Sequence, residues 1–243
     1  GLSVPLVVAA LGAWGWRDTA FASGVLVMVV GLPLVQLVRH RPEHHGEVAD
    51  GGTPEEAGST VAITLAPDFT ARQAMRTQAF WLISTGHALA LLTVSSVMVH
   101  LVPHLSEGLG YTLGAAAGFV ALMTGFQMFG QLLGGYLGDR VDKRYICAGC
   151  MLAHGLALVL VARADSLYMI VAFAVLHGLA WGIRGPQMVA LRADYFGTSS
   201  FGTIMGFSSL IVMFGMSGGP IFAGFMADVF GDYELGYTVL AVF

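Results

Sequence analysis

The sequence is poor in charged residues and in cysteine. Asp, Glu, Lys and Arg make up 11% of its 243 residues, against about 25% in soluble domains. The chain therefore has too few polar groups to cover a water-exposed surface. Its two cysteines, Cys147 and Cys150, have the spacing of a redox motif, but they lie in an apolar run and are interpreted as packing residues. The sequence also lacks a Gly-rich loop followed by Lys and Ser or Thr, so ATP is not expected to drive its function.

Long apolar runs are present instead. Hydrophobic residues make up 56% of the chain, and the mean hydropathy is +0.75. Crossing about 30 Å of hydrocarbon takes roughly 20 mostly apolar residues. Windows of that order, uncharged except for Arg184, predict complete membrane spans at 19–38, 79–105, 112–138, 145–162, 167–191 and 203–227, and shorter apolar pieces at 1–16 and 236–243 predict incomplete ones.

The predicted fold is an all-α membrane protein. Backbone groups inside hydrocarbon must be bonded within a helix or a closed barrel, and these runs lack the polar alternation of barrel strands. The chain begins with Gly1 rather than Met, has no charged leader before its first apolar run, and ends within an apolar stretch at Phe243. These features predict a fragment of a longer protein without a signal peptide.

A charged hairpin interrupts two of these runs. It reads Gly-Tyr-Leu-Gly-Asp-Arg-Val-Asp-Lys-Arg over 135–144. If this hairpin is cytoplasmic, eight basic residues fall inside and only Arg17 and Arg163 fall outside, as the positive-inside rule requires. The inside set is Arg39, Arg41, Arg72, Arg76, Arg140, Lys143, Arg144 and Arg192. The sequence thus predicts a multi-pass protein of a bacterial-type plasma (inner) membrane, with residues 39–76 in the cytoplasm.

Residues 39–76 are polar and have the composition of a flexible linker. They divide the chain into three predicted parts: 1–38, 39–76 and 77–243. The three histidines of this linker, His40, His44 and His45, leave a metal site open as an alternative, although no rigid spacing or cysteine fixes a geometry. We predict no metal site and no other cofactor.

The hairpin resembles the cytoplasmic loop motif of the major facilitator superfamily, which has glycine, three residues, Asp-Arg and then a basic pair. Other short stretches resemble the monocarboxylate porter and oxalate/formate antiporter branch, and they occur in the expected order. These are Gly15-Trp16-Arg17, 71–76 with Ala79-Phe80-Trp81, the segment from Val99 to Leu105, and Asp194-Tyr195-Phe196-Gly197.

The resemblance implies two six-helix bundles joined by a long cytoplasmic loop. On that pattern the chain holds the end of helix 5, helix 6, the loop, helices 7–11 and the start of helix 12. The expected partners are a small-molecule substrate, membrane lipid and a missing N-terminal bundle of the same protein, without nucleic acid. Carriers of the resembled branch place cations in helices 8 and 11, whereas here helix 8 offers only Gln127 and Gln131.

The hairpin is predicted to act as a conformational latch, a cluster that holds one of the alternating states. We expect Asp139 to pair with Arg192 and the basic residues to meet anionic headgroups. A glycine stripe at Gly130, Gly134 and Gly138 is expected to let bundles slide. A hairpin that only sets topology remains the alternative, and Asp142 stands where the family has Gly. The latch residues are Gly135, Asp139, Arg140, Lys143, Arg144 and Arg192.

Arg184 is the one basic residue deep inside a predicted span. A charge there is costly unless it faces a cavity or a partner, so Arg184 is the first candidate for an anion site. His87 lies at a similar depth, and Gln127 and Trp181 complete the predicted substrate pathway. A bond from Arg184 to neighbouring carbonyls, or an ion pair, remains open. His154 and His177 are predicted to be interhelical hydrogen-bond partners.

The predicted function is secondary active transport of a small organic anion, such as a monocarboxylate or dicarboxylate, by alternating access with proton symport or anion exchange. The alternative is a membrane protein that binds or senses a ligand on the same scaffold without moving it. No catalytic residue is predicted and the protein is not expected to be an enzyme, because Ser84 and His87 have a spacing that is common by chance.

Overall fold

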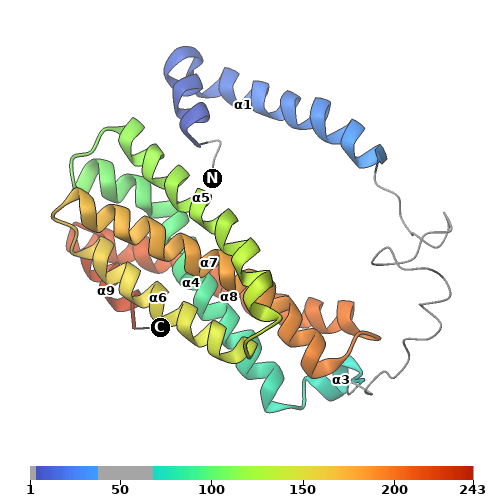
Figure 1. Cartoon of the computed structure of the whole chain (residues 1–243). Helices are drawn as coiled ribbons and strands as arrows, with labels where there is room; N and C mark the ends of the chain where they lie inside the picture. The colour runs from blue at the N-terminus through green and yellow to red at the C-terminus, as the bar shows by residue number, and fades with distance from the viewer. Residues whose placement is uncertain (1–3, 38–67, 243) are drawn as a thin grey trace. The chain divides into compact units, whose positions relative to one another are not determined.

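The computed structural model describes residues 4–37 and 68–242, and every regular element in these ranges is helical (Figure 1). Six helices are long and apolar enough to cross a membrane, which confirms the predicted all-α membrane protein. They are α1 (Val4–Leu37), α4 (Gln78–Pro103) with its π-helical continuation η3 (His104–Gly108), α5 (Leu113–Gly138), α6 (Lys143–Ala162), α7 (Leu167–Phe196) and α8 (Phe201–Phe230). The linker residues His40, His44 and His45 lie outside the described ranges.

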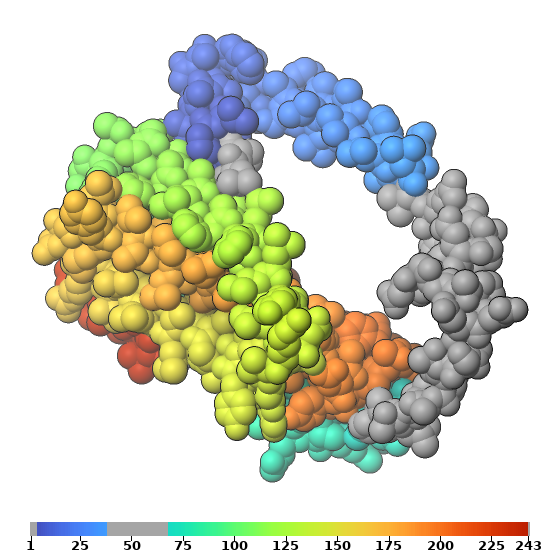
Figure 2. Space-filling view, viewed as in Figure 1, coloured from blue at the N-terminus to red at the C-terminus, as the bar shows by residue number. Residues whose placement is uncertain are grey.

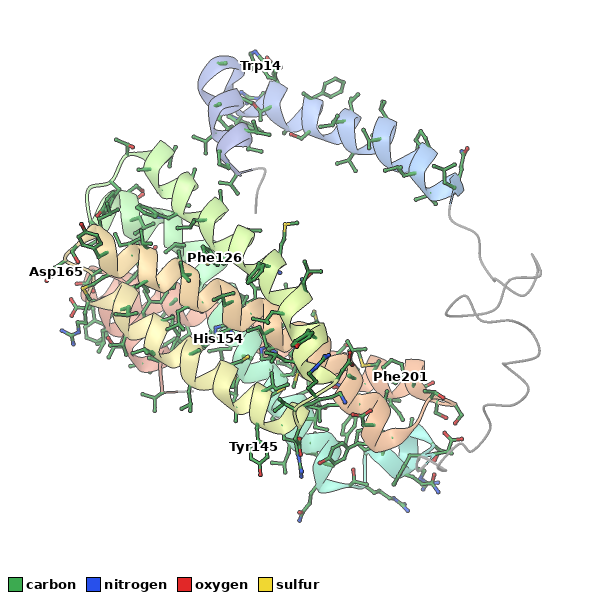
Figure 3. The ribbon with its side chains drawn as sticks, in the orientation of Figure 1. Trp14, Phe126, Tyr145, His154, Asp165 and Phe201 are labelled. Carbon is green, nitrogen blue, oxygen red and sulfur yellow. The ribbon has the colours of Figure 1, made fainter. Side chains whose placement is uncertain are left out.

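Helix α1 contains a break at Gly15, where φ is 75° and ψ is 174°. Glycine adopts this backbone without the steric cost that other residues meet. The hydroxyl of Thr19 donates to the Gly15 carbonyl at 2.7 Å, so the break does not leave that carbonyl unpaired. The sequence predicts a first span ending at Trp16 and a second beginning at Thr19, and the break lies close to that boundary. Trp14, labelled in Figure 3, lies at the bend.

The remaining helices form a bundle in which consecutive helices run in opposite directions (Figure 1). Side chains of Thr77, Thr112 and Asp142 accept backbone N–H bonds at the starts of α4, α5 and α6, which satisfies donors that a helix start leaves free. A short last helix, α9 (Glu234–Leu240), packs against α6 and α8. Helix α7 ends at Phe196, later than the predicted 191, because Gly197 provides the positive φ of 76° that stops it.

Helices α5 and α7 approach closely because glycines line their contact (Figure 2). A Cβ at Gly130 would lie 2.8 Å from the Leu179 carbonyl oxygen, and one at Gly134 would lie 2.6 Å from that of Ile183. The side-chain amide of Gln187 donates to the Gly134 carbonyl at 2.6 Å. The stripe is therefore buried inside this bundle, and the prediction that it lets bundles slide is wrong. Small residues serve close helix packing here.

The bundle has two unlike ends, and Figure 3 places Tyr145 and Phe201 at one and Asp165 at the other. The first, here called the basic end, comprises residues 68–77, 139–142 and 197–200. At this end α3 (Ala71–Ala74) begins with a capping box between Thr70 and Gln73. The Phe69 N–H donates to the Phe196 carbonyl at 2.9 Å, which ties this segment to the end of α7.

Candidate functional site: a cationic cavity beside Arg184

A cavity of about 440 Å³ lies between α4, α6 and α7, towards the basic end. Among the described residues, its lining is mostly apolar, includes two arginines and contains no carboxylate. The lining residues are Gln78, Ala79, Leu82, Ile83, Gly86 and His87 of α4, Arg144, Cys147, Ala148 and Met151 of α6, and Arg184, Met188, Leu191 and Tyr195 of α7. An apolar cavity with a few polar groups is the usual form of a small-molecule site.

Arg184 is buried, with 2% of its surface exposed, and it lines this cavity. Its Nε and Nη1 atoms have no hydrogen-bond partner among the described residues. The residue lies about 18 Å along the axis from the end of α7 at Phe196, well inside the membrane span. A charge at such a depth costs at least about 2.5 kcal/mol unless it meets a cavity or a partner.

Arg192 is equally buried, but its donors are satisfied. Its Nε and Nη2 donate to the Ser208 hydroxyl at 3.0 and 2.7 Å, and its Nη1 donates to the Met188 carbonyl at 2.6 Å. With two bonds accepted, the Ser208 hydroxyl can donate to the Ser84 hydroxyl, 2.8 Å away. This network joins α4, α7 and α8, which makes Arg192 a structural residue. The sequence alone does not predict that Ser84 and Ser208 meet, because they lie on helices far apart in the chain.

His87 connects the network to the cavity. Its Nδ1 lies 3.2 Å from Nη2 of Arg192, and its ring lines the cavity beside Arg184. Because the arginine can only donate, Nδ1 of His87 must accept, and the proton of the neutral ring then sits on Nε2. The structure thus brings Arg184 and His87 together at one cavity, as predicted. The guanidinium of Arg184 and the Nε2–H of His87 are two kinds of hydrogen-bond donor there.

The basic end of the cavity is bordered by ion pairs. Lys143 of α6 lies 2.8 Å from Asp194 of α7, and Arg144 lies 2.5 Å from Asp142. Side-chain and backbone hydrogen bonds from Arg144 lower the pKa of Asp142 from its ordinary value of 3.8 to about 2. Arg144 also lines the cavity, and because each pair joins a cation to a carboxylate, this border carries no net charge.

The predicted pair between Asp139 and Arg192 is not formed. Asp139 is exposed at the C-terminal end of α5, whereas Arg192 is buried and bonded to Ser208, Met188 and His87. A carboxylate that does bridge two helices at this end is Asp194, which pairs with Lys143 and which the sequence indicates only as part of a family motif. Arg140 packs over the ring of Tyr136 at 3.8 Å, and Gly135 is exposed with open space around it.

Gln127 and Trp181 do not line the cavity. The backbone of Gln127 contacts Gly182 at the crossing of α5 and α7, and Trp181 packs partly buried against the apolar core. Cys147, which the sequence suggested was a packing residue, lines the cavity, while Cys150 is buried. Position 147 faces α7 because it lies two turns from His154 on the same side of α6.

His154 and His177 confirm the predicted interhelical hydrogen bond. Their Nδ1 atoms lie 3.1 Å apart, with His154 on α6 and His177 on α7 (His154 is labelled in Figure 3). Both rings are fully buried, and neither Nε2 has a partner among the described residues. His177 and Arg184 are two helical turns apart on one face of α7, a separation of about 10 Å.

Comparison with known proteins identifies a matching family model, described as Major Facilitator Superfamily, over residues 1–144 and 83–243. Rat monocarboxylate transporter 13 is 28% identical over 170 residues, which cover 69% of this chain and 38% of the relative. A multidrug resistance protein B homolog of Mycobacterium tuberculosis is 26% identical over 146 residues, or 57% of this chain and 27% of the relative. The cis,cis-muconate transport protein of Acinetobacter baylyi is 26% identical over 117 residues, or 46% and 27%.

Proposed function

Since this chain belongs to the major facilitator superfamily, we propose that the protein transports a small organic anion across a membrane by alternating access. The observation that carries this proposal is the buried Arg184, whose unpartnered Nε and Nη1 adjoin a cavity without carboxylates. Nε2–H of His87 is a second donor for the same anion. The names of two relatives, a monocarboxylate transporter and a muconate transport protein, agree with an acidic substrate.

The composition of the cavity favours a monocarboxylate with an apolar body. Arg184 is the cation with free donors, because Arg144 is bonded to Asp142. The remaining walls are mostly apolar side chains such as Leu82, Ile83 and Met188. A carboxylate head can therefore meet the guanidinium in a charge-assisted hydrogen bond while the rest of the molecule contacts apolar surface.

One relative is named as a multidrug resistance protein homolog, which makes drug transport a second candidate. The apolar walls of the cavity suit many drugs. A cationic drug, however, would meet the buried Arg184, and no carboxylate lines the cavity among the described residues, so the charge of the lining favours anions among apolar substrates.

The matched stretches cover only 27% to 38% of the length of these three relatives. We propose that a second helix bundle of the same protein completes the transport path on the other side of the substrate. Rocking of the two bundles would then expose Arg184 to each side of the membrane in turn. Proton symport or exchange for another anion would drive accumulation.

The basic end is proposed to face the cytoplasm of a bacterial-type plasma membrane. Arg72, Arg76, Arg140 and Lys143 lie at or beside that end, whereas Arg163 lies at the opposite end and is bonded to Glu234. Cytoplasmic loops carry the excess of basic residues. Reporter fusions at 140 and at 164 test the sidedness.

Uptake by the protein in proteoliposomes tests the transport proposal. Labelled benzoate, L-lactate and cis,cis-muconate are compared with a neutral sugar and a cationic dye, with either an inward proton gradient or anion-loaded vesicles. Saturable uptake of a carboxylate, lost in R184Q, supports the proposal. Binding of a carboxylate without any flux would instead favour a sensor on the same scaffold, and preferential uptake of the cationic dye would favour the drug transporter.

A further inference from the structure

The imidazoles of His154 and His177 form a buried pair that is joined by one hydrogen bond. Their Nδ1 atoms are 3.1 Å apart, so one ring donates its Nδ1–H and the other accepts. In the neutral pair the accepting ring carries its proton on Nε2, and the donating ring has a bare lone pair on Nε2. Neither Nε2 has a partner among the described residues. The pair therefore retains one unoccupied position for a proton.

The pair lies close to the proposed anion site. His177 is two turns from Arg184 on the same face of α7, and His154 is two turns from Cys147 on the same face of α6. Arg184 and Cys147 both line the cavity, and so does Met151, one turn from His154. A proton that enters the cavity from solvent thus has only a short distance to travel to the pair.

We propose that His154 and His177 together bind one proton when an organic anion binds at Arg184, and that this pair couples proton and anion movement. The inference rests on the proposed function and deepens it. An empty site leaves the Arg184 charge uncompensated, and two positive charges about 10 Å apart in a buried region repel each other. A bound carboxylate cancels the guanidinium charge, and the pair can then accept a proton at the free Nε2 without facing that repulsion.

Other ionisable groups around the pair do not take over this role. The helices packed against α6 and α7 carry few of them near its depth. They are His87 on α4, His104 on η3, Tyr136 at the exposed end of α5, Cys147 and Cys150 on α6, Asp228 near the end of α8, and Tyr237 on α9. None is a carboxylate within the buried part of the bundle, so a bound anion is the negative charge that can favour a proton there.

Calorimetric titration with benzoate tests the inference. Titrations of the protein in two buffers with different ionisation enthalpies give the number of protons taken up per benzoate bound. We expect an uptake approaching one proton for the wild type in part of the range from pH 5 to 8, with an affinity that rises up to tenfold for each unit by which the pH falls. The variants H154Q and H177Q should still bind benzoate but take up no proton. H104Q removes a buried histidine that bonds to the Val161 carbonyl elsewhere and should behave as the wild type.

The outcomes separate this inference from the proposed function. Benzoate binding that depends on Arg184 but takes up no proton over the whole range overturns the proton pair and leaves the anion site standing. Retained uptake in both H154Q and H177Q also overturns the pair. No benzoate binding by the wild type overturns both. Nitrogen NMR of labelled histidine gives a second readout, because benzoate should produce imidazolium signals that H154Q and H177Q lack and H104Q keeps.

Discussion

Arg184 and His87 line the same cavity from two different helices, α7 and α4. They differ in how they are held, because His87 accepts a bond from Arg192 while Nε and Nη1 of Arg184 have no partner in the part of the chain that the structure describes. The two buried arginines of α7 thus have separate roles. Arg192 holds three helices together, and Arg184 presents an unused positive charge to the cavity.

The close approach of α5 and α7 predicts opposite effects at two adjacent glycines. G134A should destabilise the bundle by about 1 to 3 kcal/mol, because the new Cβ would lie 2.6 Å from the Ile183 carbonyl oxygen. G135A is the matched control, since nothing lies within 4 Å of its Cβ. It should be neutral or stabilising by up to about 1 kcal/mol. Thermal unfolding in detergent measures both, and equal effects would contradict the packing.

The Arg192 network predicts a cost for removing a single hydroxyl. S208A leaves Nε and Nη2 of Arg192 without their acceptor, so we expect a loss of about 1 to 3 kcal/mol of stability. S209A, at the next and exposed position on α8, should change stability little. Unfolding midpoints of the two variants provide the comparison. An S208A variant with the unfolding midpoint of the wild type would show that Arg192 finds other partners and that the network is not structural.

Cys147 offers a chemical probe of the cavity. A small methanethiosulfonate reagent should modify Cys147, which lines the cavity, far faster than the buried Cys150. Saturating benzoate should slow this modification several-fold, because the anion would occupy the space beside the thiol. Mass spectrometry of C150S and C147S follows each site separately. Unchanged labelling of Cys147 by a ligand that demonstrably binds would place the anion elsewhere.

The pair of Asp142 and Arg144 at the start of α6 predicts that the stability of the protein depends on pH in the acid range. The folded-state pKa of Asp142, about 2, is below its ordinary value of 3.8. Its contribution to stability is therefore fully present above about pH 4 and is lost as the pH falls towards 2. Carbon NMR titration of Asp142 should give the low value in the wild type and a higher value in R144Q, which keeps only the backbone hydrogen bond from residue 144. An unshifted titration in the wild type would mean that the pair is not formed.

Much of the fold follows from the sequence because the bilayer leaves few choices. Uncharged runs such as 112–138 can satisfy their backbone only as helices, and the helices α5 and α6 lie within two residues of the predicted spans. The sequence predicts an earlier end for α7, at 191, because Ala193 to Phe196 follow the charged Arg192. The helix continues there because Arg192 is buried and bonded, which hydropathy alone does not reveal.

The candidate site was only partly predictable. Depth within a span identified Arg184 and His87, since depth follows from residue number along a helix. Which helices face each other does not follow from one sequence, and this is why Arg192 was paired with Asp139 rather than with Ser208. The same uncertainty placed Gln127 in the substrate pathway, whereas its backbone packs against Gly182 of α7.

Equilibrium binding of benzoate to the wild type and to R184Q in lipid nanodiscs tests the central claim most directly. Losing a charge-assisted hydrogen bond in a buried cavity should weaken binding roughly 10- to 100-fold. R184K keeps the positive charge but lacks the planar guanidinium, so its affinity for benzoate should fall between those of the wild type and R184Q. R163Q, at the opposite end of the bundle, should bind as the wild type does. Benzoate affinity that is the same in R184Q and the wild type, with both proteins folded, would contradict the assignment of Arg184 as the anion-binding residue.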